Sequence, residues 1–147
     1  MSSVSTGRMA AMWNLPAIKP GTYGTREPEP LKPRPGDYTI IKPRWSAFFQ
    51  TELDLLLRRL GIRTVILAGT TTPNCIKTTC YDANALDYNV VVLSDCTSSQ
   101  TEEIQRVNLE DMDRMGAAIM DTKTLESYGP DTVTDWAEKI RCSLFKD

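Results

Sequence analysis

The stretch that decides the fold is TVILAGTTTPNCIKTTCYDANALD, which runs from Thr64 to Asp87. It opens with four apolar residues, 65–68, that end at Gly69, and this run predicts a parallel-sheet strand buried on both faces. A polar turn of residues 70–74 follows, and a helical pattern begins at Cys75. The side chains that repeat at spacings of three and four are Ile76, Thr79, Cys80, Ala83 and Leu86. This spacing predicts a helix with one face built to pack.

Cys75 lies at the predicted corner between this strand and this helix. The N–H groups of a first helical turn lack intrahelical partners, and their partial positive charge favours a thiolate over a thiol. The position therefore predicts a nucleophile. Cys80 and Cys96 are interpreted as small buried side chains instead, and Cys142 has no visible partner.

Composition places the chain among globular proteins with one sizeable core, since it has 147 residues of which 41% are hydrophobic and 24% charged. A net charge of −2 gives no electrostatic reason to bind nucleic acid or an anionic membrane. The sequence has no apolar run of membrane-spanning length and no secretory signal, and its four cysteines lack a disulfide spacing. We therefore expect free thiols and a cytoplasmic protein. Residues 1–20 are interpreted as an irregular tail and residues 21–147 as a single domain.

The sequence contains no histidine, which excludes a Cys–His dyad, a Ser–His–Asp triad and a histidine metal site. A cysteine phosphatase needs an arginine six residues after its nucleophile, but Cys75, Cys80 and Cys96 are followed there by tyrosine, leucine and glutamate. Cys75 and Cys80 are also too far apart for a dithiol redox motif. What remains is a thiolate supported by a lysine and a carboxylate, suited to acyl transfer at an amide-like carbon without metal or cofactor.

Strands and helices alternate along the rest of the chain. Residues 38–41 (YTII) are predicted to form a short strand that ends at Lys42, and residues 89–93 (NVVVL) a second buried parallel strand. A last short strand is predicted over residues 117–120. Ligands collect beyond the carboxyl ends of parallel strands, so Lys42 and Cys75 should share one edge of the sheet.

Three helices are predicted besides the one after Cys75. One begins at a Thr51–Asp54 capping box and ends at Gly61, another runs from a Ser99–Glu102 capping box to about Met115, and the last follows Pro130. The alternation predicts an α/β fold, namely a three-layer α/β/α sandwich with a mainly parallel, Rossmann-like sheet and right-handed crossovers.

Three blocks of the sequence resemble the isochorismatase-like cysteine hydrolases, a superfamily that includes nicotinamidases, carbamoylsarcosine amidases and ureidoacrylate amidohydrolases. The blocks are PGDYTIIKPRWSAFFQTELDLLLRRLGI, TVILAGTTTPNCIKTTCYDA and DYNVVVLSDCTSS, within residues 21–122. The residues whose spacing resembles the nucleophile block of the family are Gly69, Thr72, Cys75, Thr79, Asp82 and Ala83.

The resemblance implies Cys75 as the nucleophile and Lys42 as the cation that holds its thiolate and orients a carboxylate. It also implies a cis peptide bond between Thr70 and Thr71. The N–H groups of Thr71 and Cys75 would then face the developing oxyanion. Trp45 and Thr72 are the candidate pocket residues.

The sequence departs from the family in its N-terminal part. The family places its catalytic aspartate at the end of a first strand, whereas residues 1–36 contain no aspartate and no strand pattern. Asp37 and Asp95 are the possible substitutes, and neither is favoured. The family's second strand is also missing, which suggests a truncated or degenerate copy.

Two functions follow from these observations. The chain is either a cysteine hydrolase of a small amide or ureide, acting through a covalent intermediate on Cys75, or a catalytically inactive protein that persists as a fragment or assembles with a partner. A nucleotide-binding module has only fold analogy behind it. For the hydrolase we expect a small-molecule substrate and a homo-oligomer.

Overall fold

The computed structural model describes residues 21–128, which belong to two compact units that divide between Thr39 and Ile40. The described part of the first unit contains two 3-10 turns, η2 (Tyr23–Thr25) and η3 (Glu29–Leu31). The second unit carries all the strands and α-helices of the described chain. This division falls inside the segment 21–147 that the sequence assigned to one domain, and the two units are therefore described separately.

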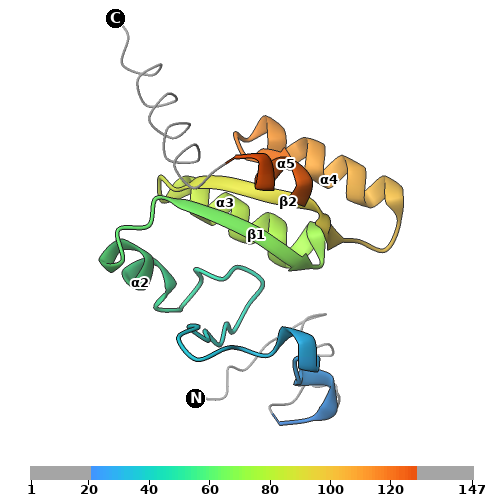
Figure 1. The fold of residues 1–147 in the computed structure, drawn as a ribbon. Coiled ribbons are helices and arrows are strands. Elements are labelled where there is room, and N and C mark those ends of the chain that lie inside the picture. The colour runs from blue at the N-terminus through green and yellow to red at the C-terminus, as the bar shows by residue number, and fades with distance from the viewer. Residues whose placement is uncertain (1–20, 129–147) are drawn as a thin grey trace, which may run out of the picture. The chain divides into compact units, whose positions relative to one another are not determined.

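A parallel sheet forms the centre of the second unit (Figure 1). Its strands are β1 (Thr64–Thr70), β2 (Asn89–Ser98) and β3 (Ala118–Met120), in that spatial order. The register of β1 against β2 runs from Thr64 beside Asn89 to Leu67 beside Val92. The strands predicted near residues 64, 89 and 117 are confirmed, and β2 continues five residues beyond the predicted end at Leu93.

Helices cover the sheet because its strands are apolar on both faces. A π-helical turn, η4 (Thr72–Ile76), leads into α3 (Lys77–Ala85), and α4 (Glu102–Arg114) packs beside them. Val90 and Val92 of β2 point into the core beneath these helices. The members of this core are Ile76, Cys80, Ala83, Tyr88, Val90, Val92, Met112 and Ala117.

Val91 and Leu93 alternate with these core residues along β2 and are also buried, so both faces of β2 are covered. The short helix α5 (Thr122–Ser127) contacts β2 as well. The predicted α/β architecture with a parallel sheet is confirmed.

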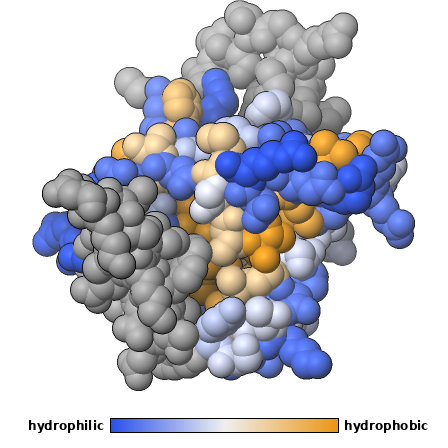
Figure 2. All heavy atoms as spheres, turned by 90° about the horizontal axis from the view of Figure 1, so that it is seen from above, coloured by the Kyte–Doolittle hydropathy of each residue, from blue (hydrophilic) through white to orange (hydrophobic). Residues whose placement is uncertain are grey.

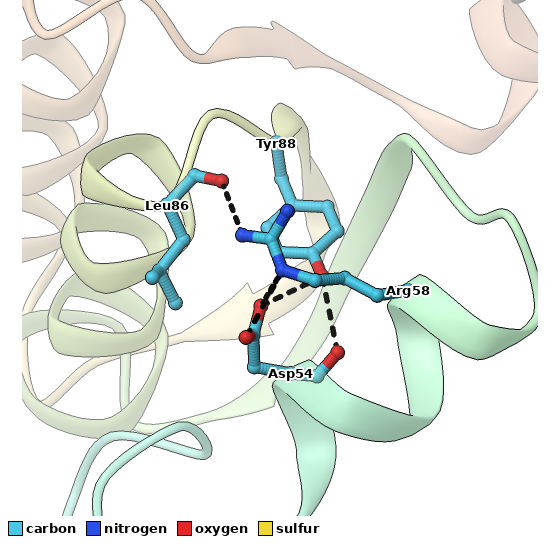
Figure 3. A network of polar contacts seen from close by, with 4 residues as sticks. All are labelled: Asp54, Arg58, Leu86 and Tyr88. Carbon is cyan, nitrogen blue, oxygen red and sulfur yellow. Dashed lines mark hydrogen bonds and ion pairs between the residues drawn. The ribbon is translucent and has the colours of Figure 1, made fainter.

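The helix before the sheet, α2 (Leu53–Arg59), is attached through polar contacts more than through burial, since none of its residues is fully buried (Figure 3). The Arg58 guanidinium donates to the Asp54 carboxylate at 2.9 Å and to the Leu86 carbonyl at 3.1 Å. The Tyr88 hydroxyl donates to Asp54 Oδ1 at 2.9 Å, and Leu57 packs against the core. The helix ends before Gly61, whose φ of 69° suits glycine, as the sequence predicts.

Two strand predictions are wrong in part. Residues 38–41 form no strand, because no residue in 21–128 pairs with them, and Tyr38 and Ile41 are 67% and 89% exposed. The strand at residues 64–70 is not buried on both faces. It is an edge strand of the described sheet, and Ile66 and Ala68 are exposed on it.

Neither predicted capping box forms in full. The residue before α2 is Glu52, which makes no side-chain hydrogen bond. Thr51 Oγ1 does accept the N–H of Leu53 at 3.3 Å, but the Asp54 carboxylate is engaged by Arg58 and Tyr88. The cap of α4 is Thr101, whose hydroxyl accepts the N–H of Ile104 at 3.2 Å.

The expected tail of residues 1–20, the helix after Pro130 and Cys142 lie outside the described residues. Within residues 21–128, no helix is both long and apolar enough to cross a membrane.

Candidate active site

The chain turns sharply where β1 ends, and this turn places Cys75. Gly69 has a φ of 118°, and the register against β2 jumps here from Leu67 beside Val92 to Gly69 beside Thr97. The Thr70–Thr71 peptide bond that follows is cis, at the position that the family resemblance implies. Cys75 then lies half-buried within η4, directly beyond the carboxyl end of the strand.

The π-helical winding of η4 determines which N–H groups are used in this turn. The Thr71 carbonyl accepts the N–H of Asn74 at 3.0 Å and the N–H of Ile76 at 3.5 Å. In an α-helix the same carbonyl would take the N–H of Cys75. The π turn therefore moves this bond one residue onward, from Cys75 to Ile76.

Lys42 meets Cys75 although the two residues are 33 positions apart. Its Nζ lies 3.3 Å from the Cys75 Sγ and donates to the Arg44 carbonyl at 3.0 Å. Both side chains are half-buried. The sequence predicted this pair on one edge of the sheet, but Lys42 follows an irregular segment instead of the expected strand.

The segment after Lys42 is attached to the core at Ala47 and Phe48. The Ala47 N–H donates to Thr79 Oγ1 of α3 at 3.0 Å, and the Ala47 carbonyl accepts from Thr51 Oγ1 at 2.5 Å. The Phe48 ring lies 5.7 Å from the Tyr88 ring between centroids. The sequence placed Thr79 on the packing face of the helix and in the nucleophile block, but it did not predict this hydrogen bond, since the partner is 32 residues away.

The two candidate pocket residues lie in different surroundings. Thr72 is completely buried, and its hydroxyl donates to the Ser98 carbonyl at 3.1 Å, which ties η4 to the end of β2. The Thr72 hydroxyl is therefore buried and makes a structural hydrogen bond. Trp45 is half-buried in the segment that carries Lys42.

The two candidate substitutes for the family's aspartate have hydrogen-bond partners within their own units. The Asp95 carboxylate accepts the hydroxyl and N–H of Thr122 at 2.6 and 3.0 Å, and these bonds, the hydroxyl first, lower the pKa of Asp95. Asp37, in the first unit, accepts the Arg34 N–H at 2.8 Å. Within residues 21–128, the hydrogen bonds of Lys42 Nζ go to Arg44 and Cys75, and no carboxylate is among them.

The other two described cysteines differ from Cys75. Cys80 is completely buried as predicted, and burial raises the pKa of its thiol to about 11. Cys96 is exposed, so its predicted burial is wrong. The reason is that β2 continues beyond Leu93, the last residue that pairs with β3.

Comparisons with known proteins identify the family. The model of the isochorismatase domain matches residues 5–124. A probable inactive nicotinamidase of Arabidopsis thaliana is 42% identical over 105 residues, which cover 71% of this chain and 48% of that protein. The ureidoacrylate amidohydrolase RutB of Methylorubrum extorquens is 35% identical over 96 residues, which cover 65% of this chain and 39% of that enzyme.

A solved structure agrees with this family. The isochorismatase family protein of Desulfovibrio vulgaris has a TM-score of 0.71 at 42% identity, covering 73% of this chain and 56% of that one. The chain thus spans between 39% and 56% of the length of these three proteins. The matches confirm the resemblance and the fold class that the sequence predicts.

Proposed function

Because the chain belongs to the isochorismatase family, we propose that it is a cysteine hydrolase that cleaves the C–N bond of a small amide or ureide. The observation that carries the proposal is the 3.3 Å approach of Lys42 Nζ to Cys75 Sγ beyond the end of β1. The ureidoacrylate amidohydrolase among the relatives supports the substrate class.

The proposed reaction has two steps. The Cys75 thiolate attacks the substrate carbonyl carbon and forms an S–C bond, and the C–N bond breaks to give a covalent acyl-enzyme. The amine leaves with a proton taken from solvent, which balances the proton that the thiol released. Water then cleaves the thioester, which releases the acid and restores the thiol. The Lys42 ammonium favours the thiolate by its charge and keeps the sulfur in place.

We also propose the N–H groups of Thr71 and Cys75 as the oxyanion donors. The winding of η4 supports this role, because the Thr71 carbonyl bonds to the N–H groups on either side of Cys75 and not to that of Cys75. Trp45, on the same segment as Lys42, is proposed as a wall of the substrate pocket.

The test is ammonia release from a panel of small amides and ureides by the purified chain. We expect Cys75→Ala to reduce release to the level of a blank, and Lys42→Met to reduce it by about 100-fold or more. Cys96→Ser is the matched control, because Cys96 is an exposed thiol on β2 and outside η4, and it should retain full release. Equal release by Cys75→Ala and the unchanged chain would contradict the proposal.

A second candidate function is a catalytically inactive family member. Two observations favour it: no carboxylate is hydrogen-bonded to Lys42 within residues 21–128, and the Arabidopsis relative is named probably inactive. This candidate predicts no release from any substrate of the panel by a chain that is folded. Cooperative thermal unfolding of the same sample establishes that the chain is folded.

A further inference from the structure

The geometry of the Lys42–Cys75 pair depends on a segment without helix or strand. Lys42 has a long flexible side chain, and residues 42–50 form bends and turns only. A 3.3 Å contact between Nζ and Sγ therefore requires something to hold the backbone of this segment against η4, which contains Cys75, and α3, which follows it. We infer that Thr79 is the positioning residue that does so, an inference that rests on the proposed function.

Thr79 joins the segment that carries Lys42 to the helix that follows Cys75. It lies on α3, four residues and about one turn after Cys75, and only 6% of it is exposed. Its Oγ1 accepts the N–H of Ala47 at 3.0 Å, and Ala47 follows Lys42 by five residues. One hydrogen bond thus joins the lysine segment to the helix next to the nucleophile.

Two further contacts of this segment lead elsewhere in the fold. Thr51 Oγ1 binds the Ala47 carbonyl from the start of α2, and the Phe48 ring packs on Tyr88 before β2. These contacts keep the segment on the core without fixing its position along α3. The hydrogen bond to Thr79 fixes the position of the segment relative to α3, and therefore relative to the Cys75 sulfur.

The chemistry of the bond suggests which substitutions separate position from packing. Thr79→Val keeps the shape of the side chain but leaves the part-buried Ala47 N–H without its acceptor, which favours a shifted segment. Thr79→Ser keeps the hydroxyl and should preserve the position. Thr97→Val is the matched control, because Thr97 is also a buried, hydrogen-bonded threonine, with 8% exposed, but its partners are Ser94 and Gln105.

The experiment measures the rate of iodoacetamide alkylation at Cys75 at pH 7, by peptide mass spectrometry, and needs no substrate. Lys42→Met should slow it by about tenfold, because it removes the ammonium group that contacts the attacking sulfur. Thr79→Val should slow it by about threefold to tenfold, whereas Thr79→Ser and Thr97→Val should stay within about twofold. The double variant Lys42→Met/Thr79→Val should be no slower than Lys42→Met alone, because Thr79 acts through Lys42.

Two further readouts separate positioning from unfolding. Amide exchange at Ala47 should become faster in Thr79→Val and remain slow in Thr79→Ser. Cys80 should stay unlabelled in every variant that is folded, and Thr79→Ala replaces Thr79→Val if the valine variant labels at Cys80.

Normal Cys75 labelling in Thr79→Val, together with slow labelling in Lys42→Met, would overturn the inference and leave the proposed function standing. Unchanged labelling in Lys42→Met would instead overturn the role of Lys42, and the positioning role of Thr79 with it. Slow labelling in the single variants that adds up in the double variant would also overturn the inference, because the two residues would then act separately.

Discussion

At the scale of single residues, the three described cysteines have three different environments. Cys75 is half-buried beside Lys42, Cys80 is completely buried in the core, and Cys96 is exposed on the end of β2. These environments decide which thiol can react, because a thiol reacts only when it is accessible and ionised. Cys80 is excluded as a nucleophile on both counts.

The raised pKa of Cys80 predicts a loss of stability in alkali. An unfolded thiol ionises near pH 9.0, whereas Cys80 in the folded chain keeps its proton up to about 11. The contribution of the protonated Cys80 thiol to the free energy of unfolding is complete below pH 9.0 and is lost as the pH rises to about 11. The loss is at most about 3 kcal/mol, at about 1.4 kcal/mol for each pKa unit.

Urea unfolding at a series of pH values checks this expectation, with Cys80→Ala as the comparison. The alanine variant should lose less stability than the unchanged chain between pH 9 and 11. Tyr81 and Tyr88 also have a raised pKa, from hydrogen bonding to Asp111 and from burial respectively, but they contribute to both chains alike. Parallel curves for the two chains would contradict the prediction.

At the scale of elements, α2 depends on one polar network because it buries little apolar surface. Asp54 and Arg58 are one turn apart on this helix and bind each other (Figure 3). Outside the helix, the Tyr88 hydroxyl donates to Asp54, and Arg58 donates to the Leu86 carbonyl. Arg58 also lies 5.4 Å from the centroid of the Tyr88 ring. The Tyr88 ring packs on Phe48 as well, so the same residue supports both α2 and the segment that carries Lys42.

Removing the Tyr88 hydroxyl should therefore loosen α2 while the core remains packed. We expect Tyr88→Phe to lower the free energy of unfolding by about 1 kcal/mol, the usual contribution of one hydrogen bond. Hydrogen exchange should also become faster in residues 53–59 than in α4. Tyr128→Phe, at a tyrosine that is 45% exposed, should change stability by less than about 0.5 kcal/mol. An equal effect of both substitutions would contradict a specific role of the network.

At the scale of the whole molecule, the described sheet has an open edge. Within residues 21–128, β1 pairs with β2 on one side only, and Ile66 on this strand is 47% exposed. Figure 2 shows hydrophobic residues gathered in the middle of the face seen from above, with hydrophilic residues beside them. Strand edges of this kind pair with other chains, so self-association follows as a prediction.

A charge at the edge should weaken this association. We expect Ile66→Lys to lower the concentration-dependent light scattering of the chain, because a lysine on an edge strand disfavours pairing with another strand. Val107→Lys is the matched control, since Val107 is also 47% exposed but lies on α4. Equal light scattering and equal sedimentation of Ile66→Lys and the unchanged chain would argue against association through β1.

Local patterns were sufficient for most elements of the described fold. The apolar runs before Gly69 and after Tyr88 predicted β1 and β2, and the spacing of Ile76, Cys80 and Ala83 predicted the helix between them. Residues 38–41 have an equally strand-like pattern and form no strand, because a strand also needs a partner for its ladder. The prediction that β1 is buried on both faces is wrong for the same reason.

The sequence by itself determined that Cys75 follows a strand at the start of a helix, because strand, turn and helix signals all lie within 24 consecutive residues. The resemblance implied that Lys42 lies beside Cys75, but only the tertiary structure decided how Lys42 Nζ reaches the sulfur and that Ala47 binds Thr79. These contacts join residues 33 and 32 positions apart through an irregular segment, whose path depends on packing and not on any periodicity of its own. Short-range order is encoded in the spacing of residues, whereas the site depends on where the core holds the segment.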